Sequence, residues 1–274
     1  MPKTQAQEDR AKIEQVEKRA TPPSPIIYEA VRRNGEEEMA RPAVSLWWSG
    51  LAAGLSISFS LVAQAVLLRH LPEMAGRELL VALGYPIGFL IVILGRQQLF
   101  TENTITVVLP VMAAPTAANF AAAARNWTIV LAANLAGTFV SAAFATFLPA
   151  VPPETFDAML AVSEHAIGGP WFEVTVRAVG AGFLMATLVW MMPGAGHSQT
   201  AVVLVMTWLI AVGGFAHVVA GSMEAWFLLL NARIGIAEFV GEFLLPSLFG
   251  NIVGGTAIFA LLAYAQVMKE IPAR

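Results

Sequence analysis

Two short polar motifs interrupt long apolar stretches, one in each half of the chain. The first reads LFTENT over residues 99–104, and the second reads GFAH over residues 214–217. A polar, non-helical stretch at membrane depth is tolerated only where it is packed in protein or lines a water-filled path. Paired interruptions in corresponding halves of a chain point to a transport site. The sequence therefore predicts a pore built around both motifs.

His217 is the strongest candidate for chemistry in that pore. It lies in an apolar run over residues 201–220, where an ionisable group is costly and functional by default. Imidazole also exchanges a proton near neutral pH, and the Gly213-Gly214 pair before it permits a helix to unwind. Thr101 is expected to lie opposite, where its hydroxyl can donate to or accept from the imidazole. The alternative is a neutral histidine hydrogen-bonded in helix packing.

Other polar residues near the breaks are expected to support the backbone. Glu102 is expected to cap the half-helix after the first break, because acidic groups stabilise helix N-termini. Asn134 and Asn251 are expected to satisfy broken backbone rather than to bind substrate. Three further acids are expected to cap or pair near the outer surface: Glu224, Glu238 and Glu242.

Arg96 and Arg177 are unexpected charges in apolar surroundings. An arginine at the bilayer centre costs about 2.5–3.5 kcal/mol even on the lenient insertion scale, so neither should face lipid. Arg96 directly precedes the first break and could attract anions or pair with Glu102. Arg177 lies about a turn inside the fourth expected span and could snorkel outward. Substrate contact and structural pairing stay open for both.

The composition is that of an integral membrane protein. Hydrophobic residues make up 57% and charged residues 13% of the 274 residues, against roughly 45–50% and 25% in soluble domains. Apolar stretches that approach the ~20 residues needed to cross a bilayer recur along the chain. We expect six spans, at residues 46–68, 79–112 with a break, 127–148, 173–192, 201–230 with a break, and 239–267.

The termini are expected to be polar and cytoplasmic. Residues 1–44 form a charged, solvated arm in this interpretation, in which residues 9–19 could be a polar helix, and residues 269–274 form a short tail. Residues 45–268 are the membrane domain. An even number of spans puts both ends on one side, and placing them inside gives the cytoplasmic segments the excess of Lys and Arg.

Several classes of function lack support in the sequence. The net charge of −3 leaves no basic footprint for nucleic acid, and the absence of cysteine removes disulfides, thiolate catalysis and sulfur metal sites. His197 and Ser198 are adjacent in a short loop, but geometry rather than adjacency defines a catalytic triad. No HExxH, P-loop or dinucleotide motif occurs. We therefore predict no enzyme, cofactor or metal site.

An internal repeat relates the two breaks. Asn134 opens NLAGT in the third expected span, and Asn251 opens NIVGGT in the sixth, 117 residues later. The same offset carries Thr101 to Val218, beside His217. Three spans followed by three similar spans have opposite orientations in the membrane, which places two broken helices face to face near the midplane. Similar composition of membrane helices rich in Gly and Ala is the alternative.

Residues 45–268 resemble the formate/nitrite transporter family. The matching motifs are residues 99–101 (LFT), 125–137 (RNW leading into NLAG), 214–217 (GFAH) and 250–255 (GNIVGG). The resemblance implies an aquaporin-like fold in the bacterial inner membrane, assembled as a homopentamer with one pore per protomer. It also implies pore roles for the first-break residues Leu99, Phe100 and Thr101, for the central histidine His217, and for the apolar constriction residues Tyr85, Phe89 and Ile210.

Four departures from the family pattern place the chain on a divergent branch. The family usually has an acidic residue directly before the central histidine and another before LFT. This chain has Ala216 and Gln98 at these two positions. The region of the family's vestibule lysine holds His165-Ala166, and a family asparagine in the fourth helix is replaced near Gly182.

We therefore expect a channel or transporter for small monovalent anions of weak acids, in which His217 assists proton-linked passage. A bare anion cannot cross an apolar constriction cheaply, because burying an isolated charge costs tens of kcal/mol in the idealised limit. There are two alternatives. One is a channel for neutral small solutes, and the other is a poorly conducting membrane scaffold whose N-terminal arm recruits a partner.

Overall fold

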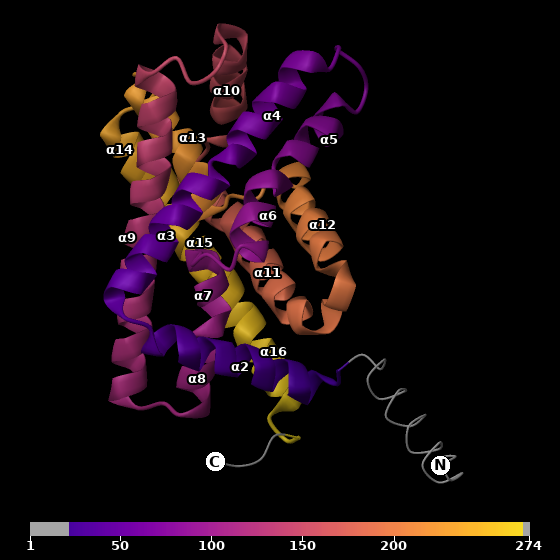
Figure 1. Ribbon diagram of the computed structural model, residues 1–274, viewed down its shortest axis with the longest axis vertical. Helices are drawn as coiled ribbons and strands as arrows, with labels where there is room; N and C mark the ends of the chain where they lie inside the picture. Colours follow the sequence, from indigo (N-terminus) through magenta and orange to yellow (C-terminus); the bar gives the residue numbers. More distant parts are fainter. Residues whose placement is uncertain (1–21, 271–274) are drawn as a thin grey trace, which may run out of the picture.

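Six membrane-crossing segments connect the two ends of the molecule in the computed structural model, which describes residues 22–270 (Figure 1). The unbroken segments are α3 (Ala43–Ile57) with α4 (Phe59–His70), α9 (Ala117–Phe147), α11 (Trp171–Ala195), and a sixth segment that combines α14 (Ile236–Glu238), η3 (Phe239–Leu244), α15 (Leu245–Ile252), η4 (Val253–Ala260) and α16 (Leu261–Val267). By length and hydropathy, five continuous helical stretches of this part could cross a membrane. One of them, 171–212, holds two antiparallel helices that join near Gly196, so the count agrees with the six expected spans.

The second and fifth segments are broken, as the sequence predicted. The second consists of α5 (Arg77–Val81), η1 (Ala82–Gly84) and α6 (Pro86–Leu94), then a break at residues 95–99, then α7 (Phe100–Thr106) and α8 (Val108–Ala113). The fifth consists of α12 (Gln199–Val212), a break at residues 213–217, and α13 (Val218–Leu230). The half over residues 77–94 is 18 residues long, whereas α12 and α13, with 14 and 13 residues, are shorter than the ~17–25 helical residues that cross a bilayer.

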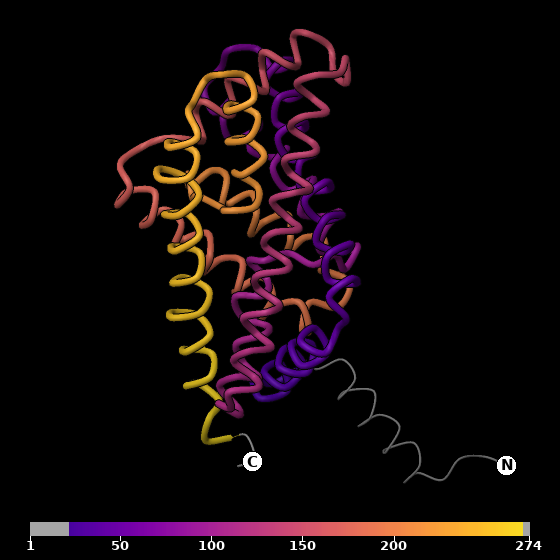
Figure 2. Tube along the Cα trace, turned by 90° about the vertical axis from the view of Figure 1, so that its left-hand side faces the viewer, coloured from indigo at the N-terminus to yellow at the C-terminus, as the bar shows by residue number. Residues whose placement is uncertain are grey.

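Local sequence determines where the long third span begins and how far it extends. The Thr116 side chain accepts a hydrogen bond from the Asn119 N–H at 3.2 Å and caps the start of α9, which satisfies one of the free N–H groups of the first turn. The 31 residues of α9 correspond to about 46 Å at 1.5 Å per residue. That length exceeds a hydrocarbon core of ~30 Å, so α9 reaches both ends of the bundle (Figure 2).

Glycines let the spans of each half cross closely. A Cβ on Gly54 of α3 would collide with the Asn134 carbonyl of α9, and a Cβ on Gly182 of α11 would collide with the Asn251 carbonyl of α15. Small residues at helix crossings permit backbone contact in membrane proteins. The glycine at position 182, a departure from the family pattern, therefore has a packing role in this chain.

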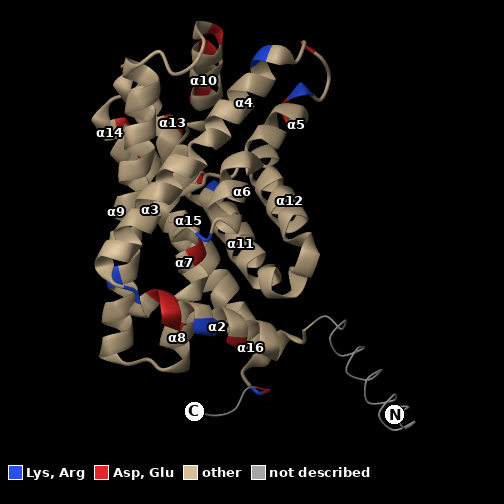
Figure 3. Cartoon of the chain, in the orientation of Figure 1, with Lys and Arg blue, Asp and Glu red and all other residues tan. Residues whose placement is uncertain are grey.

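The charged residues gather at the two ends of the molecule, apart from a few near the junction of α6 and α7 (Figure 3). Large apolar side chains are exposed along the outside of the bundle, as lipid or another protein chain requires. They include Phe139, Phe144 and Phe147 of α9 and Leu261 and Leu262 of α16. Both described ends of the chain lie at one end of the bundle, hereafter the termini end, and the opposite end is the α10 end (Figures 1 and 2).

The second half of the expected solvated arm is packed against the bundle. Helix α2 (Ser24–Ala40) crosses the termini end (Figure 1), and its residues Tyr28, Val31 and Met39 are buried. The Tyr28 ring lies 5.9 Å from the ring of Tyr264 in α16. The expectation of a solvated arm is therefore wrong for residues 24–40, because one face of this charged helix is apolar. The helix considered for residues 9–19 lies outside the described residues.

A short helix that was not expected from the sequence covers the end of the bundle opposite the termini. Helix α10 (Pro153–Ala166) lies in the acidic connection between the third and fourth spans. Met159 is fully buried in a cluster with Phe227 of α13 and Leu61 of α4. The connection thus folds back over the bundle instead of forming an open loop.

Candidate functional site

The two breaks have the same backbone geometry, 118 residues apart. Leu99 precedes α7 with φ −112° and ψ 125°, and His217 precedes α13 with φ −107° and ψ 118°. The Gln97 N–H donates to the Val92 carbonyl at 2.9 Å, and its counterpart, the Phe215 N–H, donates to the Ile210 carbonyl at 3.0 Å. The inverted repeat is therefore visible in the hydrogen bonds of the breaks.

Two buried asparagines hold the breaks. The Asn134 amide accepts from the Phe100 N–H at 2.9 Å and donates to the carbonyls of Gly50 at 2.8 Å and Gln98 at 2.9 Å. Asn251 repeats this pattern in the other half. It accepts from the Val218 N–H at 2.8 Å and donates to the carbonyls of Ala178 at 2.8 Å and Ala216 at 2.9 Å.

Both asparagines thus connect free backbone groups on either side of a break. They supply the hydrogen-bond partners that buried backbone N–H and C=O groups need. Their side chains point to backbone and not into a cavity. Their geometry favours the scaffolding role expected from the sequence.

Hydroxyl groups join the two halves across the pseudo-two-fold axis. Thr138 of α9 hydrogen-bonds to Ser222 of α13 at 2.8 Å, and Thr256 of η4 donates to the Thr104 carbonyl of α7 at 2.5 Å. The corresponding residues of the two pairs, Thr138 with Thr256 and Thr104 with Ser222, are again 118 residues apart. The two half-helices α7 and α13 are therefore fixed to the opposite half of the bundle as well as to their own.

His217 and Thr101 meet at the centre of the bundle. The Thr101 Oγ1 and His217 Nε2 atoms lie 2.8 Å apart, and the exposed fractions of the side chains are 0% and 2%. The repeat does not make these residues equivalent, because the observed offset of 118 pairs His217 with Leu99. The expected contact is present even though the 117-residue register is one residue short at the breaks.

The bonds of His217 identify the nitrogen that carries its proton. Nδ1 accepts from the Ala220 N–H at 3.1 Å and caps α13. In a neutral imidazole the other nitrogen is then the donor, so Nε2–H donates to Thr101 Oγ1. A second proton on Nδ1 would break the cap. His217 is therefore built to present an N–H group on its Nε2 side.

Aromatic and aliphatic groups surround the pair. The Phe89 ring stands edge-on to the His217 imidazole with centroids 5.0 Å apart, and the Tyr85 and Phe89 rings are 5.1 Å apart. Ile210 is fully buried. Phe100 points elsewhere and packs on Trp127 at 5.8 Å, so its pore role stays a prediction.

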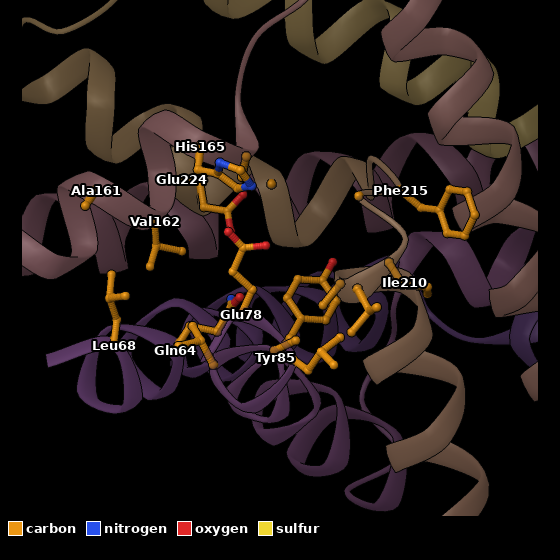
Figure 4. A pocket seen from close by; sticks show the side chains of 18 of the residues that line it. Gln64, Leu68, Glu78, Tyr85, Ala161, Val162, His165, Ile210, Phe215 and Glu224 are labelled. Carbon is orange, nitrogen blue, oxygen red and sulfur yellow. The ribbon is translucent and has the colours of Figure 1, made fainter. Parts of the chain in front are cut away.

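A cavity of about 630 Å³ leads from the α10 end to His217. Of the predicted site residues, Tyr85, Ile210, Arg177 and His217 line it, whereas the first-break residues lie beyond it. Figure 4 shows Tyr85 and Ile210 near its deep end and polar side chains along its length. Within residues 22–270 no three His, Asp or Glu side chains gather as metal ligands would.

The two arginines have different environments. Arg96 is exposed and has φ 51°, matching φ 62° at its counterpart Gly214. It thus forms the left-handed turn of the first break, and within the described residues it makes no ion pair with Glu102. Arg177 is half-buried, and its Nη2 donates to the Gly168 carbonyl at 2.6 Å. Arg177 lines the cavity and Arg96 does not, and an anion-attracting role stays a prediction for both.

The acids agree with the expectation only in part. Glu102 lies in the first turn of α7 without a side-chain capping bond, so only the dipole part of its expected role applies. Glu238 does cap, because its carboxylate accepts from the Gly235 N–H at 2.6 Å. Within the described part of the chain Glu224 neither caps a helix nor forms an ion pair. It is 5% exposed and lines the cavity, and its position seven residues after His217, two turns along one helix face, is the signal that could have identified it.

A carboxyl group of α2 reaches the first break, a contact that no sequence motif indicated. Glu38 accepts hydrogen bonds from Asn103 Nδ2 at 2.9 Å, from Gln98 Nε2 at 3.5 Å and from the Thr106 hydroxyl. Burial raises the pKa of this carboxyl, while the three donors and Arg41 act in the opposite direction. Glu38 therefore links α2 to α7.

Replacing Glu38 by alanine should loosen α2. Removal of the acceptor leaves buried donors unpaired, which costs about 1–3 kcal/mol, and backbone hydrogen exchange over residues 24–40 should quicken. The raised pKa means that docked α2 holds a proton more readily than free α2. Its docking should therefore be strongest in acid and weaken as pH rises through the raised pKa. The exposed neighbour Glu37 provides the control Glu37→Ala, and equal exchange in both variants would contradict the link.

The bundle consists of two inverted three-span halves, and its two half-helices meet at a buried His–Thr pair. This arrangement defines a membrane channel of aquaporin-like fold. The sequence profile described as formate/nitrite transporter matches residues 25–265. The chain therefore belongs to the formate/nitrite transporter family. It is a channel or transporter and not an enzyme.

Relatives and solved structures agree with this assignment. The chain is 43% identical over 260 residues to the inner membrane protein YfdC of Escherichia coli. This match covers 95% of this chain and 84% of that protein. It is 27% identical over 246 residues to the formate channel FocA of Haemophilus influenzae, covering 78% and 84% of the two chains. A pentameric formate channel with formate bound has a TM-score of 0.69 over 83% of this chain and 98% of that one, at 20% identity. An FNT family ion channel has a TM-score of 0.72 over 90% and 99%, at 18% identity.

Proposed function

We propose that this protein conducts small monovalent anions of weak acids, such as formate, together with a proton. The observation that carries the proposal is the His217–Thr101 pair, 2.8 Å apart, which presents an N–H group at the base of a cavity open to the α10 end. The names of the relatives FocA and the formate-bound channel support formate as the first solute to test.

The geometry suggests how the pair helps a solute across. A charge loses its hydration among Phe89, Ile210 and Tyr85, and burying it unpaired is costly. The His217 Nε2–H can turn from Thr101 to the solute and form a charge-assisted hydrogen bond, which is roughly twice as strong as a neutral one. A solute that has gained a proton carries no charge and passes the apolar segment with less cost.

We further propose the surroundings in which this pore works. The relative YfdC is named as an inner membrane protein, and the excess of Lys and Arg in the terminal segments favours a cytoplasmic termini end. The related channel is pentameric, and the exposed apolar faces of α9 and α16 suit both lipid and neighbouring protomers. We propose a homopentamer, which native mass spectrometry of the solubilised protein tests against the chain mass of 29.2 kDa.

A flux screen in proteoliposomes tests the function. Formate, nitrite, hydrosulfide, acetate and lactate are presented at several pH values, and a dye inside the vesicles reports pH. We expect uptake of at least one anion that rises as the pH falls, with acidification inside, because a neutral acid releases its proton after entry. Osmotic swelling without a pH change would indicate a channel for neutral solutes. Absence of all flux would favour the membrane scaffold.

A further inference from the structure

One carboxyl group in the cavity has no partner. Glu224 lies on α13 and its side chain is 5% exposed. Within residues 22–270 it forms no hydrogen bond and no ion pair. It lines the same cavity as His217 and Gly221 of the same helix. Seven residues of α-helix span about 10 Å, so Glu224 stands between the cavity mouth and the His217–Thr101 pair.

The charged groups that face Glu224 are already engaged or lie at the mouth. Arg77 of α5 pairs with Glu73, and Arg177 of α11 binds the Gly168 carbonyl. The remaining titratable groups of the lining are Glu78 of α5, His165 of α10, Tyr85 and His217. Figure 4 shows the carboxyl groups of Glu224 and Glu78 turned towards each other, with the imidazole of His165 beside Glu224. Among residues 22–270 no cation forms an ion pair with Glu224.

The chemistry of an unpaired carboxyl group limits what it can bind. An ionised carboxylate only accepts hydrogen bonds, whereas a protonated one has an O–H donor. Only the protonated form attracts an incoming anion, and an O–H···O⁻ bond between a carboxylic acid and a carboxylate is among the strongest hydrogen bonds. The ligand class that fits Glu224 is therefore a small carboxylate that arrives without its proton.

We propose that Glu224 is the proton-exchange site of this vestibule, an inference that rests on the proposed weak-acid function. The Glu224 O–H bond breaks as a new O–H bond forms on the bound carboxylate, so the solute becomes a neutral acid and the negative charge moves to Glu224. A hydronium ion from the cavity mouth then returns a proton to Glu224 and leaves water. One anion and one external proton enter together, and the neutral acid continues past Tyr85 to His217.

The variant Glu224→Gln in the full-length protein tests the proposal, with formate as the probe in proteoliposomes. Glutamine keeps the size and hydrogen-bonding capacity of the side chain but exchanges no proton. We expect formate uptake at pH 7 to fall at least tenfold. The deficit should shrink as the pH falls, because the bulk solution then supplies more neutral formic acid. The matched control is Glu242→Gln, which changes an exposed carboxyl of η3 that does not line the cavity and should stay within twofold of wild type.

The outcomes separate this inference from the proposed function. A wild-type protein that takes up none of the screened anions contradicts the function itself, and uptake of non-carboxylate anions alone overturns the role of Glu224. Wild-type uptake with an unchanged rate and pH profile in Glu224→Gln overturns only the role of Glu224. A second measurement needs no variant: a hydrophobic carbodiimide should label Glu224 in the wild-type protein, and formate should slow the labelling. Labelling that formate leaves unchanged would equally overturn the proposal.

Discussion

Phenylalanine in place of His217 should lower formate flux by about 10- to 100-fold at every pH. The Nε2–H of His217 is the donor that the site offers to a solute, and a buried acceptor left without its donor costs about 1–3 kcal/mol, or about one to two factors of ten. Phenylalanine fills the space beside Phe89 and Ile210 but donates nothing. Stopped-flow uptake by proteoliposomes measures the loss.

The shape of the pH profile distinguishes His217 from Glu224. A neutral acid also loses its hydrogen bond in the His217→Phe variant, so acidification should not restore the flux as it does for Glu224→Gln. The matched control is His197→Phe, which changes an exposed histidine in the turn between α11 and α12 and should leave flux unchanged. Wild-type flux in a correctly assembled His217→Phe protein would refute the donor role.

The fold could be predicted because its main features follow from local sequence. Polar residues and paired glycines inside apolar runs mark a break in any membrane helix, and the asparagines Asn134 and Asn251 reveal the repeat. Asn134 and Asn251 are 117 residues apart, so the repeat offset predicted from them is 117. The breaks themselves are 118 residues apart, since Leu99 and not Thr101 corresponds to His217.

Features that depend on packing between distant segments could not be predicted. Arg32 of α2 is 3% exposed and is neutralised by Glu29 and Glu36 of its own helix, so a sequence rich in charge hides a buried face. Glu38 reaches α7 across 65 residues of chain. Glu224 resembles any other acid near a helix end until α10 covers the cavity above it. The contacts of Arg32 and Glu38 are set by the tertiary fold and have no local signature. For Glu224 the seven-residue spacing from His217 indicates a shared helix face, and the tertiary fold decides that this face lines a cavity.

The leucine variants of Asn134 and Asn251 should destabilise the protein by about 3–9 kcal/mol each. Each amide bonds one N–H and two carbonyl groups of buried backbone, and a buried polar group left unpaired costs about 1–3 kcal/mol. Leucine has a similar shape and can form none of these bonds. Because stabilities of 5–15 kcal/mol are typical, assembly should fail or the melting temperature should drop sharply, as thermal unfolding in detergent would show.

Asn126 provides the control within the same helix. It is 0% exposed in α9, like Asn134, but its amide nitrogen and oxygen have no hydrogen-bond partner in the described part of the chain. Removal of an unsatisfied buried amide costs little or even stabilises, so Asn126→Leu should unfold at or above the wild-type temperature. If Asn134→Leu and Asn126→Leu unfolded alike, the amide bonds would not be what holds the break. Similar losses for Asn134→Leu and Asn251→Leu would instead show that the two halves hold their half-helices by the same bonds, which is what the pseudo-two-fold geometry requires.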